Sequence, residues 1–153
     1  MNTEKLTTKS RDAVTAAVRQ ALTAGNPSAE PVHLLHGLLL TPDNTVGALL
    51  SAVGADPATI DARAAEAIAR QPSSTGSSVT QPTISGALAR VLAMAETLAE
   101  KLGDQFVATE HLLISLATVE SQARTILTRA GVTPEKLTKV ITKIGRASCR
   151  ERV

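Results

Sequence analysis

Two histidines lie three residues apart in an apolar segment, a spacing that places both on one face of a helix. His33 and His36 could share a metal ion there, but zinc sites use three or four protein ligands, and no cysteine or second histidine and carboxylate cluster accompanies them. His33 also has a counterpart, His111, in a matching sequence context. We interpret His33 and His111 as structural histidines that hydrogen-bond near a helix start. We expect no metal and no cofactor in this chain.

The glycines and serines do not form the motifs that bind phosphate or activate a nucleophile. The sequence contains no GxxxxGK[ST] loop, no GxGxxG loop and no GxSxG elbow. A serine in a flexible polar run also lacks the neighbouring base that would activate it. The chain is therefore predicted to be a binding module and not an enzyme.

Polar side chains beside helix starts are the remaining candidates for a site. Thr7 precedes the first apolar helical stripe, and Asp104 and Glu110 flank the start of a buried helix, where Thr109 is the expected N-cap. Their oxygens could simply cap free helix amides and complement the helix dipole. The alternative hypothesis is that Thr7, Asp104 and Glu110 converge and form a binding site.

Apolar residues recur at helical spacing along the chain and predict an all-α fold of eight helices in two sets of four. Two helix starts carry the same signal, Asp56-Pro57 and Thr133-Pro134, in which a capping oxygen precedes a proline at the first helical position. The expected helices cover about residues 8–24, 32–40, 45–53, 56–70, 88–102, 109–117, 121–130 and 134–143.

The two sets are copies of one unit. Gly25 to Leu39 (GNPSAEPVHLLHGLL) aligns with Gly103 to Ala117 (GDQFVATEHLLISLA), so that the glycines and the His-Leu-Leu triplets coincide. Further on, the Gly-x-x-Pro segments of both copies also align, at an offset that is one residue shorter than the offset between the two His-Leu-Leu triplets. We expect two pseudo-symmetric four-helix repeats, at residues 6–70 and 84–143, joined by a polar linker at 71–83.

The last ten residues do not continue this pattern. Residues 144–153 (IGRASCRERV) resemble the translation of one frame of a widely used sequencing adapter, so we interpret them as an artefactual tail after a domain of residues 1–143. Without the tail's three arginines and Glu151, the formal net charge falls from +2 to zero. Cys149, the only cysteine, also belongs to the tail, so we expect neither a disulfide nor thiol chemistry.

The composition disfavours nucleic-acid and membrane partners. A nucleic-acid surface would need a basic stripe or exposed aromatic rings, whereas the corrected charge is zero and Phe106 is the only aromatic residue. No apolar run approaches the roughly 20 residues of a membrane span, and the N-terminal residues lack the apolar stretch of a signal peptide. We expect a cytoplasmic protein.

The sequence resembles the N-terminal Clp repeat domain of Clp-type AAA+ chaperones, and most of all the ClpB-type disaggregases. The resemblance extends over residues 6 to about 143. It rests on the duplicated unit and on three short motifs: Leu6-Thr7-x-Lys9, Glu30-Pro31-x-His33-Leu34 and Gly103-Asp104-x-Phe106-x-x-x-Glu110.

The resemblance implies that the domain engages unfolded or aggregated protein, with adaptor proteins as further partners. It also implies a parent that is a homohexameric ATPase ring, to which the domain passes its clients, and a role for Thr7, Asp104 and Glu110 in this coupling. The ATPase motifs are absent from this sequence. The isolated fragment is expected to be a monomer.

Two alternatives share the fold. ClpC-type unfoldases carry Gly-Thr-Glu-His in both copies, with glutamates that can recognise phosphoarginine, whereas here Val32 stands at the glutamate position of the first copy. This departure disfavours a symmetric phosphoarginine reader. A stand-alone Clp-repeat adaptor or scaffold is the other alternative.

Weak apolar contact in a groove suits a domain whose partners have no fixed sequence. The candidate groove residues are Leu6, Met94 and Phe106, together with Leu92, for which a core position is the better interpretation. Met94 is the strongest candidate, because its side chain is adaptable and lies off the main apolar stripe of its helix.

Overall fold

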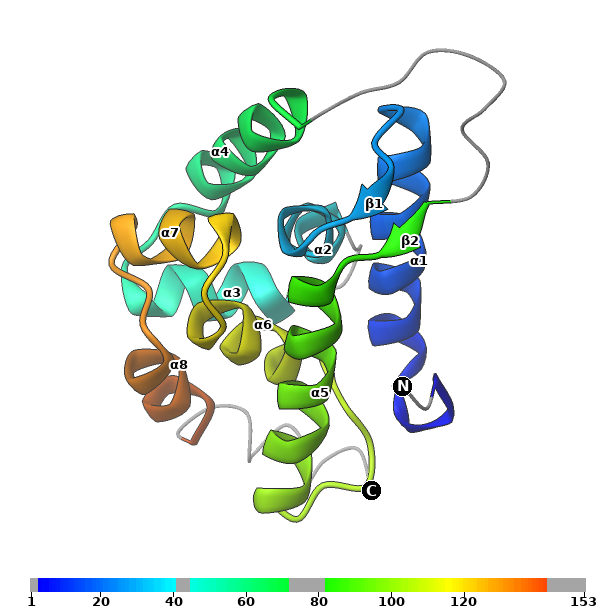
Figure 1. Cartoon of the computed structure of the whole chain (residues 1–153). Helices are drawn as coiled ribbons and strands as arrows, with labels where there is room; N and C mark the ends of the chain where they lie inside the picture. The colour runs from blue at the N-terminus through cyan, green and yellow to red at the C-terminus, as the bar shows by residue number, and fades with distance from the viewer. Residues whose placement is uncertain (1–2, 41–44, 72–81, 143–153) are drawn as a thin grey trace.

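The computed structural model describes residues 3–40, 45–71 and 82–142, and these residues form eight α-helices (Figure 1). The first copy contains α1 (Thr8–Thr23), α2 (Pro31–Leu40), α3 (Thr45–Val53) and α4 (Pro57–Ala69), after a short 3-10 turn, η1 (Thr3–Lys5). The second copy contains α5 (Gly86–Lys101), α6 (Thr109–Thr118), α7 (Gln122–Arg129) and α8 (Pro134–Val140). The predicted all-α class is confirmed.

Most helices begin where a side-chain oxygen meets a free amide. The Thr7 hydroxyl accepts from the Ser10 N–H (3.1 Å), and the Asp56 carboxylate accepts from the Ala58 N–H (3.2 Å). Thr133 caps α8 in the same way. The predicted Thr109 cap of α6 is wrong: Ala108 occupies the cap position, and the Thr109 side chain is buried.

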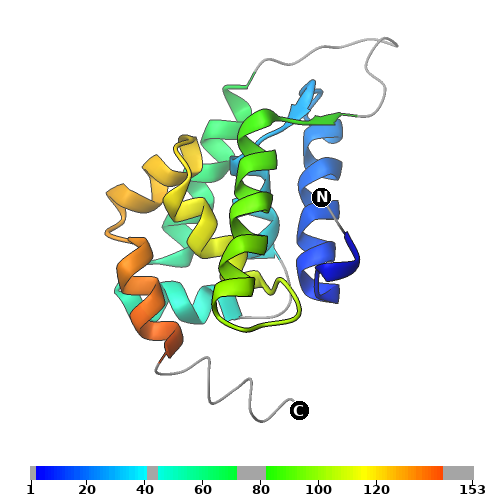
Figure 2. The ribbon, with the colours of Figure 1, turned by 60° about the horizontal axis from the view of Figure 1, so that its bottom comes forward.

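The two repeats interlock and do not pack as separate bundles. The third helix of each copy contacts the fourth helix of the other, so α3 packs on α8 and α7 packs on α4. The central helices α2 and α6 also contact each other, and α7 and α8 lie on the side of the molecule away from α1 (Figure 2). The apolar faces of both copies therefore share one core, with Leu34, Leu35, Leu112 and Leu113 fully buried.

Short parallel backbone pairings also link the copies. Strand β1 (Ser28–Ala29), between α1 and α2, pairs with β2 (Thr83–Ile84), just before α5. The equivalent pairing joins Leu6, just before α1, to Val107, between α5 and α6. Pairings this short show no alternation in a sequence and were not predicted. Thr83 therefore belongs to β2, although it was assigned to the linker.

Two predicted segments fall mainly outside this structure. Residues 72–81 of the linker and the whole tail, residues 144–153, lie outside the described residues. Within the described ranges, no helix is long and apolar enough to cross a membrane.

Candidate functional site

The segment before α1 and the loop between α5 and α6 form one corner of the molecule. The Thr7 N–H donates to the Val107 carbonyl (3.1 Å), and the Val107 N–H donates to the Lys5 carbonyl (2.7 Å). Val107 lies between Asp104 and Glu110 in the sequence, so these bonds hold Thr7 against the loop that carries both carboxylates. The backbone thus brings together the segments that carry the three predicted polar residues.

A buried histidine, His111, holds this loop in place through hydrogen bonds at both of its ring nitrogens. His111 Nδ1 accepts from the Ala108 N–H (2.8 Å), and His111 Nε2 lies 2.9 Å from Asp104 Oδ2. The ring takes the place of the glutamate in a capping box, because it satisfies the free amide at the helix start. The His111 side chain is 3% exposed and that of Asp104 is 43% exposed. One carboxylate oxygen is thus held by the ring while the group still reaches solvent.

The first copy has the same brace with a neutral partner. His33 Nδ1 accepts from the Glu30 N–H (2.8 Å), and His33 Nε2 lies 2.9 Å from Asn26 Oδ1. These partners require the neutral ring with its proton on Nε2. Burial lowers the pKa of His33, which favours the same neutral form. The predicted structural role of His33 and His111 is confirmed.

His36 has a different partner from His33. Its Nδ1 lies 2.6 Å from Asp61 Oδ1, so it links α2 to α4. Among the residues that the structure describes, no three histidine, cysteine, aspartate or glutamate side chains are placed to hold a metal ion.

Glu110 lies in the first turn of α6 and is half-buried. Within the described ranges, no hydrogen bond or ion pair to another residue occupies its carboxylate. At the equivalent corner of the first copy, 78 residues earlier, Val32 and Asn26 replace Glu110 and Asp104. Only the corner formed by Thr7, Asp104 and Glu110 therefore carries carboxylates at these positions, and we call it the acidic corner.

Two of the four predicted groove residues are buried in the structure, and two are exposed. Leu6 is 2% exposed and paired with Val107, so its assignment to an open groove is wrong: the pairing draws its side chain into the core. Leu92 is also a core residue, as interpreted. Met94 and Phe106 are exposed, at 39% and 52%.

Two further apolar residues extend this surface and were missed. Leu98 on α5 is half-buried, and Leu102, which caps the C-terminal end of α5, is 42% exposed; both follow Met94 at four-residue spacing. Residues with this spacing lie on one face of a helix. We call Met94, Leu98, Leu102 and Phe106 the apolar strip. The four-residue spacing was visible in the sequence, but neither Leu98 nor Leu102 was named there as a candidate groove residue.

The fold and its histidine-braced loops define a duplicated helical repeat domain. The family model of the Clp repeat (R) N-terminal domain matches residues 5–130, and the chain belongs to this family. The predicted family is confirmed.

Curated proteins similar to this chain include ClpB chaperones. Chaperone protein ClpB of Propionibacterium freudenreichii subsp. shermanii is 67% identical over 139 residues, which cover 91% of this chain and 16% of that protein. The chain spans about one sixth of the length of the curated relatives it matches.

Solved structures share the fold at lower identity. The N-terminal domain of Hsp104 from Candida albicans has a TM-score of 0.77 and 19% identity, with 90% of this chain and 89% of that chain covered. A ClpV N-domain in complex with a VipB peptide has a TM-score of 0.69 and 22% identity, with 88% of this chain and 82% of that chain covered.

Proposed function

We propose that this chain is the protein-binding module of a ClpB-type chaperone. It engages unfolded or aggregated protein and passes it to an ATPase ring formed by the rest of a homohexameric parent. The module itself catalyses no reaction and needs no cofactor, and on its own it is a monomer. Its place is the cytoplasm, where unfolded proteins and adaptor proteins are its partners.

The observation that carries this proposal is the apolar strip beside the acidic corner. Met94 and Leu98 lie four residues apart on α5, Leu102 caps the C-terminal end of this helix, and Phe106 lies in the following loop, which the backbone ties to Thr7. Exposed apolar side chains can contact many unfolded sequences weakly, because burial of apolar area does not depend on a particular partner geometry. The peptide bound to the ClpV N-domain supports a protein ligand for this fold.

The acidic corner has a second role in this proposal. Asp104 and Glu110 add negative charge next to the strip, which favours unfolded chains that carry basic segments. Exposed charge pairs contribute only about 0.2–1 kcal/mol each, so the apolar strip supplies most of the affinity.

One observation separates this proposal from a ClpC-type module. A reader with two equivalent sites would need an acidic residue at both corners, and Val32 occupies the position in the first copy at 1% exposure. A stand-alone adaptor is distinguished by the gene itself: an uninterrupted clone with a Walker A motif after residue 143 establishes the chaperone, and an immediate stop codon establishes the adaptor.

A binding titration with a reduced, unfolded model protein tests the proposal. Met94→Ser with Phe106→Ser should weaken binding about tenfold, because two half-exposed apolar side chains lose the area they bury. Leu22→Ser is the matched control, because Leu22 is 48% exposed on α1, away from the strip. Binding should change less than about twofold in this control, and all variants should keep the wild-type Tm. Equal weakening by the control, or unchanged binding by the double variant, contradicts the proposal.

A further inference from the structure

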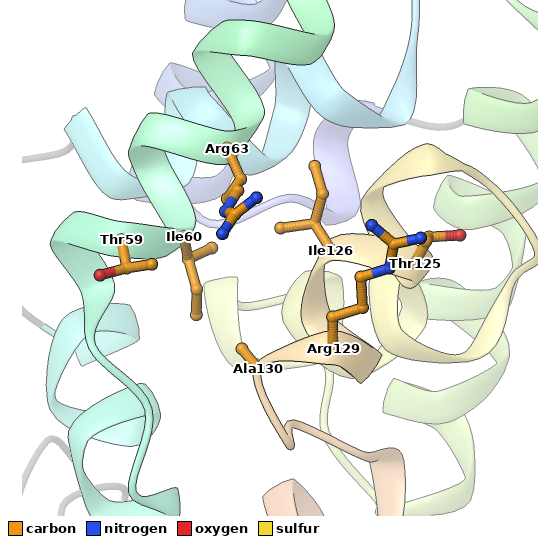
Figure 3. Close-up of a pocket in the computed structure, with 7 residues that line it drawn as sticks. All are labelled: Thr59, Ile60, Arg63, Thr125, Ile126, Arg129 and Ala130. Atoms are coloured by element: carbon orange, nitrogen blue, oxygen red, sulfur yellow. The ribbon is translucent and has the colours of Figure 1, made fainter.

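A pocket between α4 and α7 is separate from the acidic corner. It encloses about 240 Å³, and its apolar floor includes Ile60, Ile126 and Ala130. Arg63 from α4 and Arg129 from α7 also line it, and Figure 3 shows their guanidinium groups on either side of the Ile126 side chain. The pocket therefore combines an aliphatic surface with a cation on each side.

Neither arginine has an acidic partner among the described residues. In the part of the chain that the structure describes, no ion pair or hydrogen bond occupies Arg63 or Arg129. Asp61, an acidic residue of the same helix α4, is bound to His36 on α2. Both arginine side chains are exposed, so an anionic ligand can reach them without displacing a partner.

The cations are not needed to pack these helices. The pseudo-equivalent junction joins α3 to α8, and there Ala52 and Val140 stand 77 residues away from Arg129 and Arg63. The two junctions have the same helix pairing in the fold. The arginines therefore distinguish the α4–α7 junction from its pseudo-equivalent, the α3–α8 junction.

We propose that the α4–α7 pocket binds a peptide segment in which an aliphatic side chain is flanked by acidic side chains. The aliphatic group packs on Ile60 and Ile126, and the flanking carboxylates accept hydrogen bonds from the two guanidinium groups, whose planar forks match carboxylate geometry. A nucleic acid fits less well, because the described lining offers no aromatic ring for base stacking. This site lies apart from the apolar strip and would add a defined peptide partner to the proposed binding of unfolded chains.

Fluorescence anisotropy with a labelled synthetic peptide of alternating glutamate and leucine tests the proposal, at low ionic strength and on the whole chain. Arg63→Gln with Arg129→Gln should weaken binding about five- to tenfold, the sum expected of two exposed charge pairs. Arg124→Gln is the matched control, because Arg124 is an exposed arginine of α7 that does not line the pocket. A peptide with glutamine in place of glutamate should bind as weakly to wild type as the acidic peptide binds to the double variant.

The outcomes distinguish binding of the acidic peptide in the α4–α7 pocket from nonspecific attraction of the peptide to positive charge. Selective weakening in the double variant, with wild-type Tm and unchanged binding by Arg124→Gln, supports the site. Equal weakening by Arg124→Gln, tighter binding of a single-stranded oligonucleotide, or no difference between the two peptides overturns it. Met94→Ser with Phe106→Ser should leave binding of this peptide unchanged, so the result does not depend on the proposed function of the strip.

Discussion

Asn26 and Asp104 occupy equivalent positions and contact equivalent histidines, but one is an amide and the other a carboxylate. If His33 were protonated, its Nδ1–H would face the Glu30 N–H, so that two donors would oppose each other. The neutral Asn26 side chain would offer no negative charge to compensate. With Asp104 as partner, the proton on His111 Nε2 faces a carboxylate oxygen. The same fold therefore holds one histidine in a neutral setting and the other in an anionic one.

The stability of the domain should fall as the pH falls below about 6.5, the ordinary pKa of histidine. Because burial lowers the pKa of His33 in the folded state, the unfolded chain binds the proton more readily, and the contribution of His33 is complete above that pH and lost below it. Urea unfolding at several pH values measures this. His33→Gln should be less stable at neutral pH but should lose less stability between pH 7 and 5 than wild type; a steeper loss in the variant would contradict this account.

The helix pair α1 and α2 illustrates how small residues set an element's position. A Cβ added at Gly37 on α2 would lie 2.7 Å from the Ala13 carbonyl oxygen of α1, and Ala13 and Ala17 are fully buried in this contact. Backbone atoms cannot move aside as the end of a flexible side chain can. The close approach of these two helices therefore depends on glycine at this position.

Gly37→Ala should lower the free energy of unfolding by about 1–2 kcal/mol, because the overpacking cost exceeds the gain of about 1 kcal/mol in helix propensity. Gly86→Ala is the control, since Gly86 begins α5 and an added Cβ would meet only the end of the Arg90 side chain, at 4.0 Å. Thermal and urea unfolding should show the control to be neutral or slightly stabilised. Similar destabilisation by both substitutions would mean that the α1–α2 approach has no special role.

At the scale of the whole molecule, the sequence predicts the helices well and their assembly poorly. Helix starts such as Asp56-Pro57 are local events, in which one side chain meets an amide two or three residues away, so they can be read from the chain. The repeat register likewise predicted which residues are equivalent. It could not predict that α3 and α4 would pack on α8 and α7, because equivalence does not specify which surfaces meet.

Some features of the candidate site were likewise predictable from the sequence, and others were not. Thr7 was predictable as a cap, and its meeting with the loop of Asp104 and Glu110 was expected from chain order. The burial of Leu6 was not, because it depends on a backbone pairing with Val107, about a hundred residues away. The exposure of Met94 followed from its place off the apolar stripe of its helix, and Phe106, a candidate groove residue, is exposed as well.

Amide NMR of the isotope-labelled chain, titrated with a reduced unfolded protein, tests the central claim most directly. The account predicts that the largest shift changes follow α5 from Met94 to Leu102, continue through Phe106 and reach the start of α6 at Glu110. The corner that carries Asn26 and Val32 should change little. Changes centred on that corner or on α3 and α8, with Met94 and Phe106 unaffected, would contradict the claim that the apolar strip and the acidic corner bind unfolded protein.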